Sequence, residues 1–403
     1  MRHGVPVALF LVACTKSPIQ LLEERVQRDV TLADLESADW ADEALSASDA
    51  EGAEQILHDV LLAQLRVERQ GELEARRLTD GEYEMPLWWT TYGDATDGER
   101  SLFISMHGGG GTEPEVNDQQ WRNQQRLYEP DEGVYVAPRA PSNEWNLWHR
   151  PEVDGFMDRL IEDMVALEGV DPDRVYLTGY SAGGDGAYQL AWHLADRFAA
   201  ANPNAGHPND STPLPMRNLP LTIHMGGEDS AFHRNGVAAE WRDELAALQQ
   251  ADPEGYVHEV VIHPGLPHWM NGEDAVAIPW MAEHTRQRSP NRVVWPVRGE
   301  RSGQRFYWLG LEDPLAHSGI TLVASVSGNT IAIESDAPVS GLTVWLDDAL
   351  VDLDEPVTVQ INGAEVYNAR VERTIATVAR SLTSDGAAFV PRRAVIEGLP
   401  TSE

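Results

Sequence analysis

A pentapeptide near the middle of the chain could supply a nucleophile. Gly179-Tyr180-Ser181-Ala182-Gly183 matches the pattern GxSxG, in which a serine occupies a tight turn between a strand and a helix. The flanking positions must be small because the turn is sharp, and the serine Oγ is then exposed at the carboxyl edge of a sheet. Three fixed residues of this kind occur by chance in about one chain in seven of this length. The motif therefore needs support from the other groups that acyl transfer requires.

A run of glycines upstream of the serine could supply an oxyanion hole. His107-Gly108-Gly109-Gly110-Gly111 directly follows a predicted strand. Backbone N–H groups in such a loop can stabilise the oxyanion of a tetrahedral intermediate. The predicted donors are the amides of Gly109, Gly110 and Ala182, the last being the residue after the nucleophile. A flexible turn stays open as an alternative, whereas a phosphate-binding loop is disfavoured because no Gly-Lys-Ser/Thr follows.

Two residues downstream of Ser181 fit the acid and the base of a triad. In sites built on a GxSxG turn, the acid and then the histidine follow the serine along the chain. Asp229 and His268 each lie in a loop that follows a predicted strand, so both could reach the same sheet edge. His268 could then take the proton of Ser181 while Asp229 fixes the imidazole tautomer. Glu228 stays open as an alternative acid, and four other histidines are expected to be structural or exposed: His224, His233, His258 and His263.

Aromatic residues close to these groups could line a substrate pocket. Trp145, Trp148 and His149 lie in a segment between a predicted strand and a predicted helix, where loops border such sites. Packing beneath the loop is an equally good interpretation of these three residues. Tyr180 and Trp269 are also predicted to line the pocket. No HExxH, paired CxxC or calcium-loop pattern is present, so the sequence implies neither a metal nor another cofactor.

The segments that carry these residues alternate between strands and helices. This alternation predicts a mostly parallel sheet covered by helices, which is the α/β class. The predicted strands are 102–106, 133–136, 175–178, 219–223 and 256–263, and the predicted helices are 153–167, 184–199 and 278–288.

The two ends of the chain have different patterns. Residues 20–77 are acidic and predicted to be helical, either packed on the catalytic domain or acting as a membrane spacer. Beyond about residue 296 the pattern predicts short strands, the first at 305–309, a type I′ turn at Asn362-Gly363 and a helix near 372–382. The predicted domains are a signal at 1–14, a helical extension at 15–83, a catalytic domain at 84–295 and a small β-rich domain at 296–403.

The catalytic segment resembles the α/β-hydrolase superfamily, and more narrowly its polyhydroxybutyrate-depolymerase and feruloyl-esterase relatives. The resemblance covers residues 84–288 and rests on the segment 171–179, the motif at Ser181 and the pair His268-Trp269. It implies the α/β-hydrolase fold, ester hydrolysis and a triad of Ser181, Asp229 and His268. Secreted members often have disulfides, which a chain with one cysteine cannot form internally, and no Ser/Thr-rich linker to a polymer-binding module is visible.

The first fourteen residues are typical of an export signal, with a basic start and the short apolar run 5–13. Leu11-Val12-Ala13-Cys14 resembles the bacterial lipobox, which implies lipidation of Cys14 and a location in the cell envelope, at an outer membrane or cell surface. A short secretory signal, with a periplasmic or secreted product, stays open as the alternative.

Charge and composition narrow the possible partners. The chain has 30 basic and 65 acidic residues, a formal net charge of −35, which repels phosphate backbones and argues against nucleic acid. The expected partners are an ester substrate, either small or polymeric, and a membrane reached through Cys14. Two alternatives remain: a serine peptidase of the prolyl-oligopeptidase type, disfavoured because no propeller-sized domain is visible, and a binding lipoprotein on a hydrolase scaffold.

Overall fold

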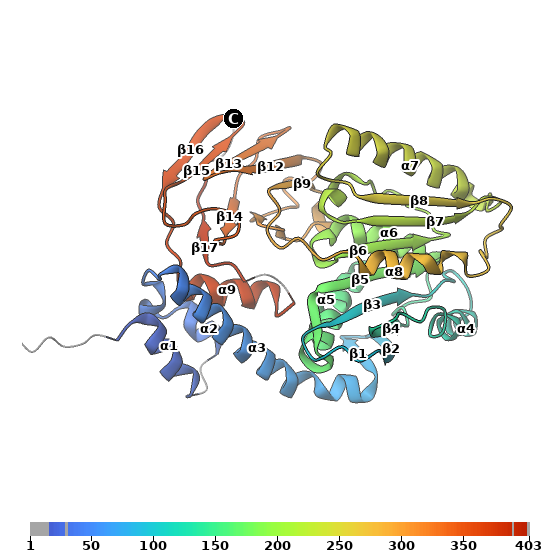
Figure 1. The fold of residues 1–403 in the computed structure, drawn as a ribbon, viewed down its shortest axis with the longest axis horizontal. Helices are drawn as coiled ribbons and strands as arrows, with labels where there is room; N and C mark the ends of the chain where they lie inside the picture. The colour runs from blue at the N-terminus through green and yellow to red at the C-terminus, as the bar shows by residue number, and fades with distance from the viewer. Residues whose placement is uncertain (1–15, 29–30, 389–390, 401–403) are drawn as a thin grey trace, which may run out of the picture.

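The computed structural model of the protein describes residues 16–28, 31–388 and 391–400, so the predicted signal and Cys14 lie outside the described residues. Its main feature is an eight-stranded sheet of order β1-β2-β4-β3-β5-β6-β7-β8 (Figure 1). β2 is antiparallel to β1 and β4, and the other neighbours are parallel. The strands are β1 (Arg77–Asp80), β2 (Tyr83–Tyr92), β3 (Arg100–Met106), β4 (Gly133–Pro138), β5 (Val170–Tyr180), β6 (Ala200–Asn204), β7 (Leu221–Gly226) and β8 (His258–His263). The predicted α/β-hydrolase fold class is confirmed.

Helices cover both faces of this sheet. The helices are α4 (Pro114–Gln124), α5 (Pro151–Glu168), α6 (Ala182–His193), α7 (Arg234–Ala251) and α8 (Ala277–Ala282). Successive side chains of a strand face opposite sides. Leu102 and Ile104 of β3 therefore belong to a core with α5, α6 and α7, whereas Phe103 belongs to a cluster with α8. Because both faces are covered, strands such as β4 and β7 are buried along their whole length.

Several segments differ from the predicted elements, including β1, β2, α4 and α7, which are not among them, and three further differences have a local cause. The sequence does not predict β6, because its residues AANPN include asparagine and proline, which are rare in strands. The predicted helix 278–288 ends at Ala282 because the chain turns to place the Arg286 N–H 2.9 Å from the Asp173 carbonyl oxygen. The predicted strand 305–309 is instead a hairpin of β10 (Arg305–Phe306) and β11 (Leu309–Leu311), with Tyr307 at a φ of 55° in the turn.

Two further sheets form the β-rich C-terminal part of the fold. Their strand orders are β16-β15-β13-β12-β9 and β10-β11-β14-β17. The remaining strands are β9 (Arg292–Pro296), β12 (Thr321–Ser327), β13 (Thr330–Ser335), β14 (Leu342–Leu346), β15 (Val357–Ile361), β16 (Ala364–Ala369) and β17 (Ala394–Ile396). Asn362 and Gly363 connect β15 to β16 with φ angles of 48° and 80°, as the predicted type I′ turn requires. These sheets share one continuous apolar core with the large sheet.

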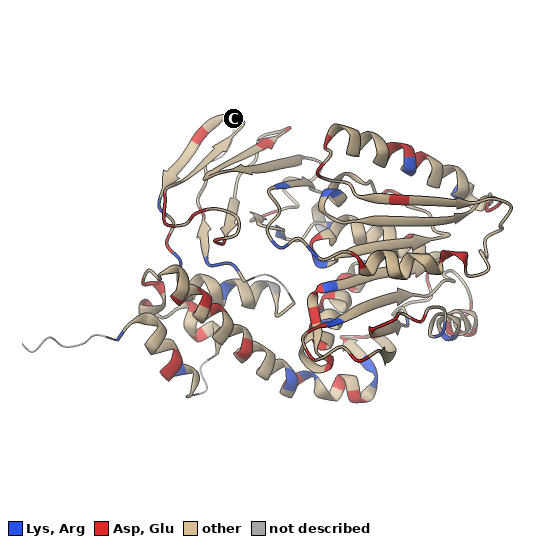
Figure 2. Ribbon diagram, in the orientation of Figure 1, with Lys and Arg blue, Asp and Glu red and all other residues tan. Residues whose placement is uncertain are grey.

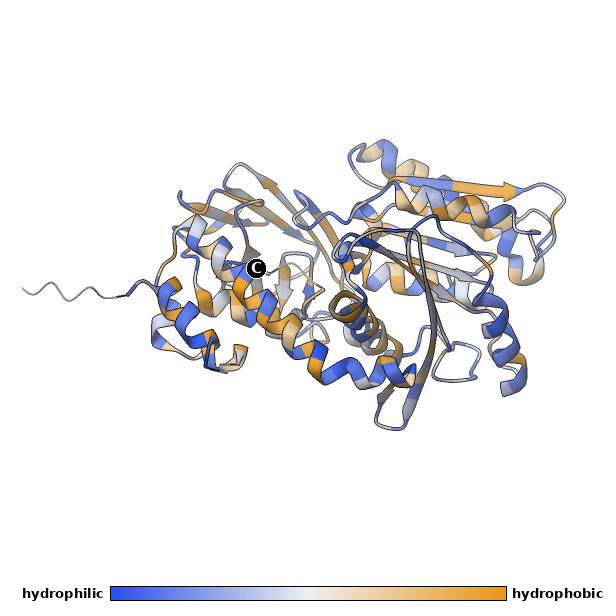
Figure 3. Cartoon of the chain, turned by 60° about the horizontal axis from the view of Figure 1, so that its bottom comes forward, coloured by the Kyte–Doolittle hydropathy of each residue, from blue (hydrophilic) through white to orange (hydrophobic). Residues whose placement is uncertain are grey.

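The N-terminal helices join the two β-containing parts of the molecule. They are α1 (Pro18–Val26), α2 (Leu32–Glu36) and the long α3 (Ala47–Ala75), and their main partner is α9 (Ile375–Asp385). Leu22 and Leu57 form an apolar cluster with Ile375 and Leu382 of α9. Further along, α3 lies against α5, which packs on the large sheet. The apolar residues of α3 lie mainly in its middle, and its last third is strongly polar (Figure 3).

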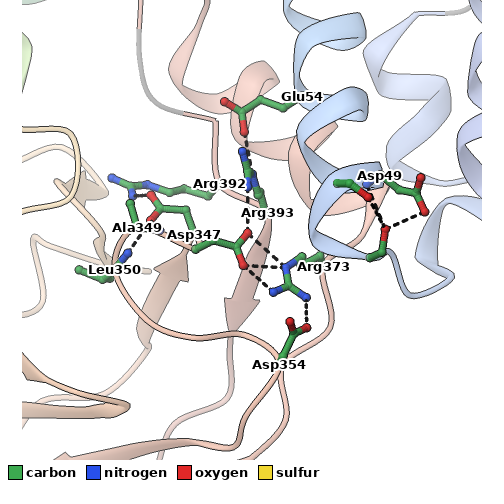
Figure 4. A network of polar contacts seen from close by, with 12 residues as sticks. Asp49, Glu54, Asp347, Ala349, Leu350, Asp354, Arg373, Arg392 and Arg393 are labelled. Carbon is green, nitrogen blue, oxygen red and sulfur yellow. Dashed lines mark hydrogen bonds and ion pairs between the residues drawn. The ribbon is translucent and has the colours of Figure 1, made fainter.

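Arginine ion pairs reinforce this junction (Figure 4). The Arg393 side chain donates to Glu54 of α3 (2.8 Å) and to Asp348 (2.9 Å). Arg373, which is buried, donates from Nε to Asp348 Oδ1 (2.9 Å) and from Nη1 to Asp354 Oδ1 (2.9 Å). The described helices of the N-terminal extension are therefore packed against the rest of the protein.

Carboxylates are spread both over the N-terminal helices and over the large sheet with its helices (Figure 2). Within the residues that the structure describes, no helix is both long and apolar enough to span a membrane.

Replacing Leu57 by alanine tests the contribution of the N-terminal helices to stability. Leu57 is fully buried against α9, so the cavity left behind should lower the free energy of unfolding by about 2–5 kcal/mol. Thermal and urea unfolding would measure the effect. Val67→Ala, at an exposed position of the same helix, is the matched control and should leave stability nearly unchanged.

Asp163 should make stability depend on pH. It is fully buried on α5, 3.7 Å from Arg69 of α3, and burial raises its pKa from 3.8 to about 7. Because the folded-state pKa is the higher one, the free energy of unfolding should fall as the pH rises from about 4 to 7. Asp163→Asn should therefore raise the melting temperature at pH 8 but not at pH 4. Asp59→Asn, at an exposed position, is the control, and an equal effect of Asp163→Asn at both pH values would contradict the interpretation.

Candidate active site

Ser181 occupies a strained, tight turn between β5 and α6. Its backbone angles are φ 59° and ψ −121°, a region that residues other than glycine rarely adopt. A Cβ on Gly179 would lie 2.1 Å from the Gly183 carbonyl oxygen, and one on Gly183 would lie 2.1 Å from the Met106 carbonyl oxygen of β3. Both glycines of the motif are therefore required by close backbone contacts.

The structure brings Ser181, His268 and Asp229 together. His268 Nε2 is 2.9 Å from Ser181 Oγ, and His268 Nδ1 is 2.6 Å from Asp229 Oδ2. Asp229 follows β7 and is buried, and its second oxygen lies 3.5 Å from Arg234 Nη1. A carboxylate at Nδ1 favours the tautomer that carries its proton there, which leaves Nε2 free to accept the serine proton. The alternative acid, Glu228, is exposed to solvent.

His107 holds the glycine loop beside the serine. It is fully buried, and its Nε2 accepts a hydrogen bond from the Ala140 N–H (3.1 Å), so Nδ1 carries the proton and donates to the Gly108 carbonyl oxygen (2.6 Å). Burial lowers the pKa of His107 to about 3, which keeps the ring neutral. The C=O and N–H of a trans peptide point in opposite directions. The Gly109 N–H is therefore directed away from His107.

The three predicted oxyanion donors are not equivalent. Gly109 lines the same cavity as Ser181, and Ala182 is the first residue of α6, where N–H groups have no partner within the helix. The Gly110 N–H instead donates to Asn117 Oδ1 (2.8 Å). This hydrogen bond stabilises the loop, so the Gly110 N–H is not available to an oxyanion. Asn117 could not be recognised from the sequence, because a lone asparagine on a polar helix carries no motif.

A cavity of about 700 Å³ opens at Ser181 and His268. Of the predicted pocket residues, Tyr180 and Trp269 line it. One wall comes from α4 and the residues after it, which the sequence analysis did not single out: Gln120, Asn123, Gln124, Arg126 and Leu127. Gln124 is buried and donates to Ser105 Oγ (2.6 Å), whereas Arg126 is exposed.

Two of the other predicted pocket residues, Trp148 and His149, make contacts within the fold and are not among the residues that line the cavity. Trp148 is fully buried, and its indole N–H donates to the His107 carbonyl oxygen (2.8 Å). The His149 carbonyl oxygen accepts a hydrogen bond from Arg301 (2.8 Å), and burial lowers the pKa of the His149 ring to about 4. Trp145 is 63% exposed and lies against Gly111 of the glycine loop.

The described part of the chain contains no group of three or more His, Cys, Asp or Glu side chains arranged for a metal ion.

Comparisons with known proteins find similarity to esterases and related hydrolases. A bifunctional acetylxylan esterase/xylanase from Neocallimastix patriciarum is 25% identical over 197 residues, which are 47% of this chain and 29% of that protein, so the chain spans less than a third of its relative. Among solved structures, a thermostable esterase is 20% identical with a TM-score of 0.40, covering 52% of this chain and 62% of its own. Esterase 2 of Thermogutta terrifontis is 17% identical with a TM-score of 0.35, covering 50% of this chain and 87% of its own. Residues 139–279, which include Ser181, Asp229 and His268, match the model of the dienelactone hydrolase family.

Proposed function

We propose that the protein is a serine hydrolase that cleaves carboxylic esters through an acyl-enzyme intermediate. The observation that carries this proposal is the hydrogen-bonded series Asp229–His268–Ser181 at the mouth of a cavity. The match to the dienelactone hydrolase family over the same residues supports it.

The mechanism assigns one role to each group. His268 Nε2 accepts the Ser181 proton as Oγ bonds to the ester carbonyl carbon, and the amides of Gly109 and Ala182 stabilise the oxyanion. The protonated His268 then donates to the departing alkoxide, which leaves as an alcohol. In the second half, His268 takes a proton from water, the hydroxide attacks the acyl-enzyme, and Ser181 recovers its proton as the acid leaves. Asp229 stabilises the imidazolium in both halves.

The cavity and its rim favour an acylated polysaccharide over a polyester. Gln120, Asn123 and Arg126 offer hydrogen-bonding groups that hydroxyl-bearing substrates can use. Large aromatic side chains are exposed on loops that flank the triad: Trp145 is 63% exposed, Phe232 78% and Trp269 49%. Flat aromatic rings of this kind are suited to packing against sugar rings. The relative from Neocallimastix patriciarum is an acetylxylan esterase/xylanase, and acetylxylan is an acylated polysaccharide.

A set of purified variants tests the triad. Ser181→Ala and His268→Ala should each lower kcat by about 10⁴ to 10⁶, and Asp229→Asn should lower it somewhat less, with KM little changed because these side chains act mainly in the transition state. Hydrolysis of p-nitrophenyl acetate and of acetylated xylan measures the effect, and peptide amides in the same assay test for a peptidase. Glu228→Gln is the control and should keep most activity. Equal turnover by Ser181→Ala and the unmodified protein would refute the serine mechanism.

We further propose that the protein is exported and anchored through an acylated Cys14. The support is the lipobox-like Leu11-Val12-Ala13-Cys14 and the absence of any other cysteine in the sequence. Two or more acyl chains would hold the protein on a membrane, where one chain binds only reversibly. Metabolic labelling with a palmitate analogue should tag the unmodified protein but not Cys14→Ser. Equal labelling of both proteins would exclude the anchor.

A further inference from the structure

The loop that carries His268 has little regular structure of its own. It connects β8 to α8 and contains three residues with positive φ: Gly265 (71°), Asn271 (56°) and Gly272 (81°). The His268 side chain is partly exposed, so the surrounding packing alone does not immobilise the imidazole. Because Nε2 must stay within hydrogen-bonding distance of Ser181 Oγ, this loop needs specific attachments to the elements that hold the serine.

The side chain of Tyr180 supplies such an attachment. Its hydroxyl donates to the His268 carbonyl oxygen (2.7 Å) and accepts from the Met270 N–H (3.0 Å), so one oxygen bonds the main chain on both sides of Trp269. The Tyr180 ring also packs edge-on against the His268 imidazole, with centroids 6.0 Å apart, and against the Trp269 ring at 5.5 Å.

The chemistry of Tyr180 suits this role. It is the residue directly before the nucleophile, so its backbone is fixed by the last pairing of β5 with β6. The side chain is nearly buried, and burial raises its pKa well above the ordinary value, so the hydroxyl stays protonated and able to donate. A phenylalanine would keep the ring contacts but lose both hydrogen bonds.

A second attachment lies at the far end of the same loop. Tyr128 donates to Asp274, and Asn204 Nδ2 donates to the Tyr128 hydroxyl (3.0 Å). The main-chain oxygen of Asn204 also accepts the Ser181 N–H (2.9 Å). The segment 268–274 is thus connected at both ends to the residues that fix the nucleophile.

We propose that Tyr180 is a positioning residue, whose hydroxyl holds the His268 loop so that the imidazole stays aligned with Ser181. This inference rests on the proposed function, because alignment matters only if Ser181 and His268 react together. Tyr180 acts through the backbone of His268 and takes no part in proton transfer.

The test compares Tyr180→Phe with a matched control. Tyr188 of α6 is also a buried tyrosine, but its hydroxyl has no hydrogen-bond partner within the described residues, so Tyr188→Phe removes the same atom without breaking a bond. Tyr180→Phe should lower kcat for p-nitrophenyl acetate by about 10- to 100-fold, since small misalignments of reacting groups cost rates of this order. KM should change less than about twofold, because the ring that lines the cavity is kept.

Two further readouts separate positioning from a general loss of structure. The rate at which a fluorophosphonate labels Ser181 should fall in Tyr180→Phe by a similar factor to kcat, while the fraction finally labelled stays complete. Tyr188→Phe should match the unmodified protein in both. Unchanged kcat in Tyr180→Phe, or a loss explained by a smaller labelled fraction, would overturn the positioning role. If Ser181→Ala keeps full activity, the proposed function itself fails, which is a distinct result.

Discussion

The backbone contact between the tight turn at Ser181 and its neighbouring strands is the constraint on which the candidate site depends. Gly183 packs against the end of β3, and Gly179 packs against Gly183, with no room for a Cβ at either position. Ser181 adopts a backbone conformation that costs about 1–3 kcal/mol. Hydrogen bonds from the Ser181 N–H to Asn204 and from the Asp185 N–H to Ser181 hold it there, at 2.9 Å each. The register of β3, β5 and β6 therefore fixes the position of Ser181, the proposed nucleophile.

Charged side chains have different effects at the surface of the protein and in its interior. The carboxylate excess favours hydration of the surface but adds repulsion within the fold, and salt screens such repulsion. At the junction of the N-terminal helices with the C-terminal sheets, the buried Arg373 and the partly buried Arg393 each pair with two carboxylates. The guanidinium group suits these positions because it has five donors in a fixed plane and is less strongly hydrated than an ammonium group.

The proximity of Ser181, Asp229 and His268, the proposed triad, was predictable because their order along the chain follows from the order of the strands. Each follows a strand, and parallel strands end at the same edge of the sheet, so local patterns are enough to place the three residues near each other. The wall formed by α4 could not be predicted in this way. Gln120 and Arg126 look like ordinary surface residues, and only the packing of α4 over the edge gives them a role. For Trp148 the sequence left a pocket position and packing beneath the loop equally open, and the structure has the indole buried, with its N–H donating to the His107 carbonyl oxygen.

The packing of α3 against a helix near the C-terminus affects how the chain can fold during its synthesis. Its apolar residues pack against α9, and the side chain of His58 meets the Ala387 carbonyl oxygen across 329 positions of sequence. During translation, α3 emerges from the ribosome long before α9 is synthesised. The apolar stripe of α3 therefore lacks its packing partner for most of translation. Long-range contacts of this kind slow folding and expose the chain to aggregation. Any product that stops before α9 would carry this stripe uncovered, which gives chaperones and proteases a way to distinguish unfinished chains from complete ones.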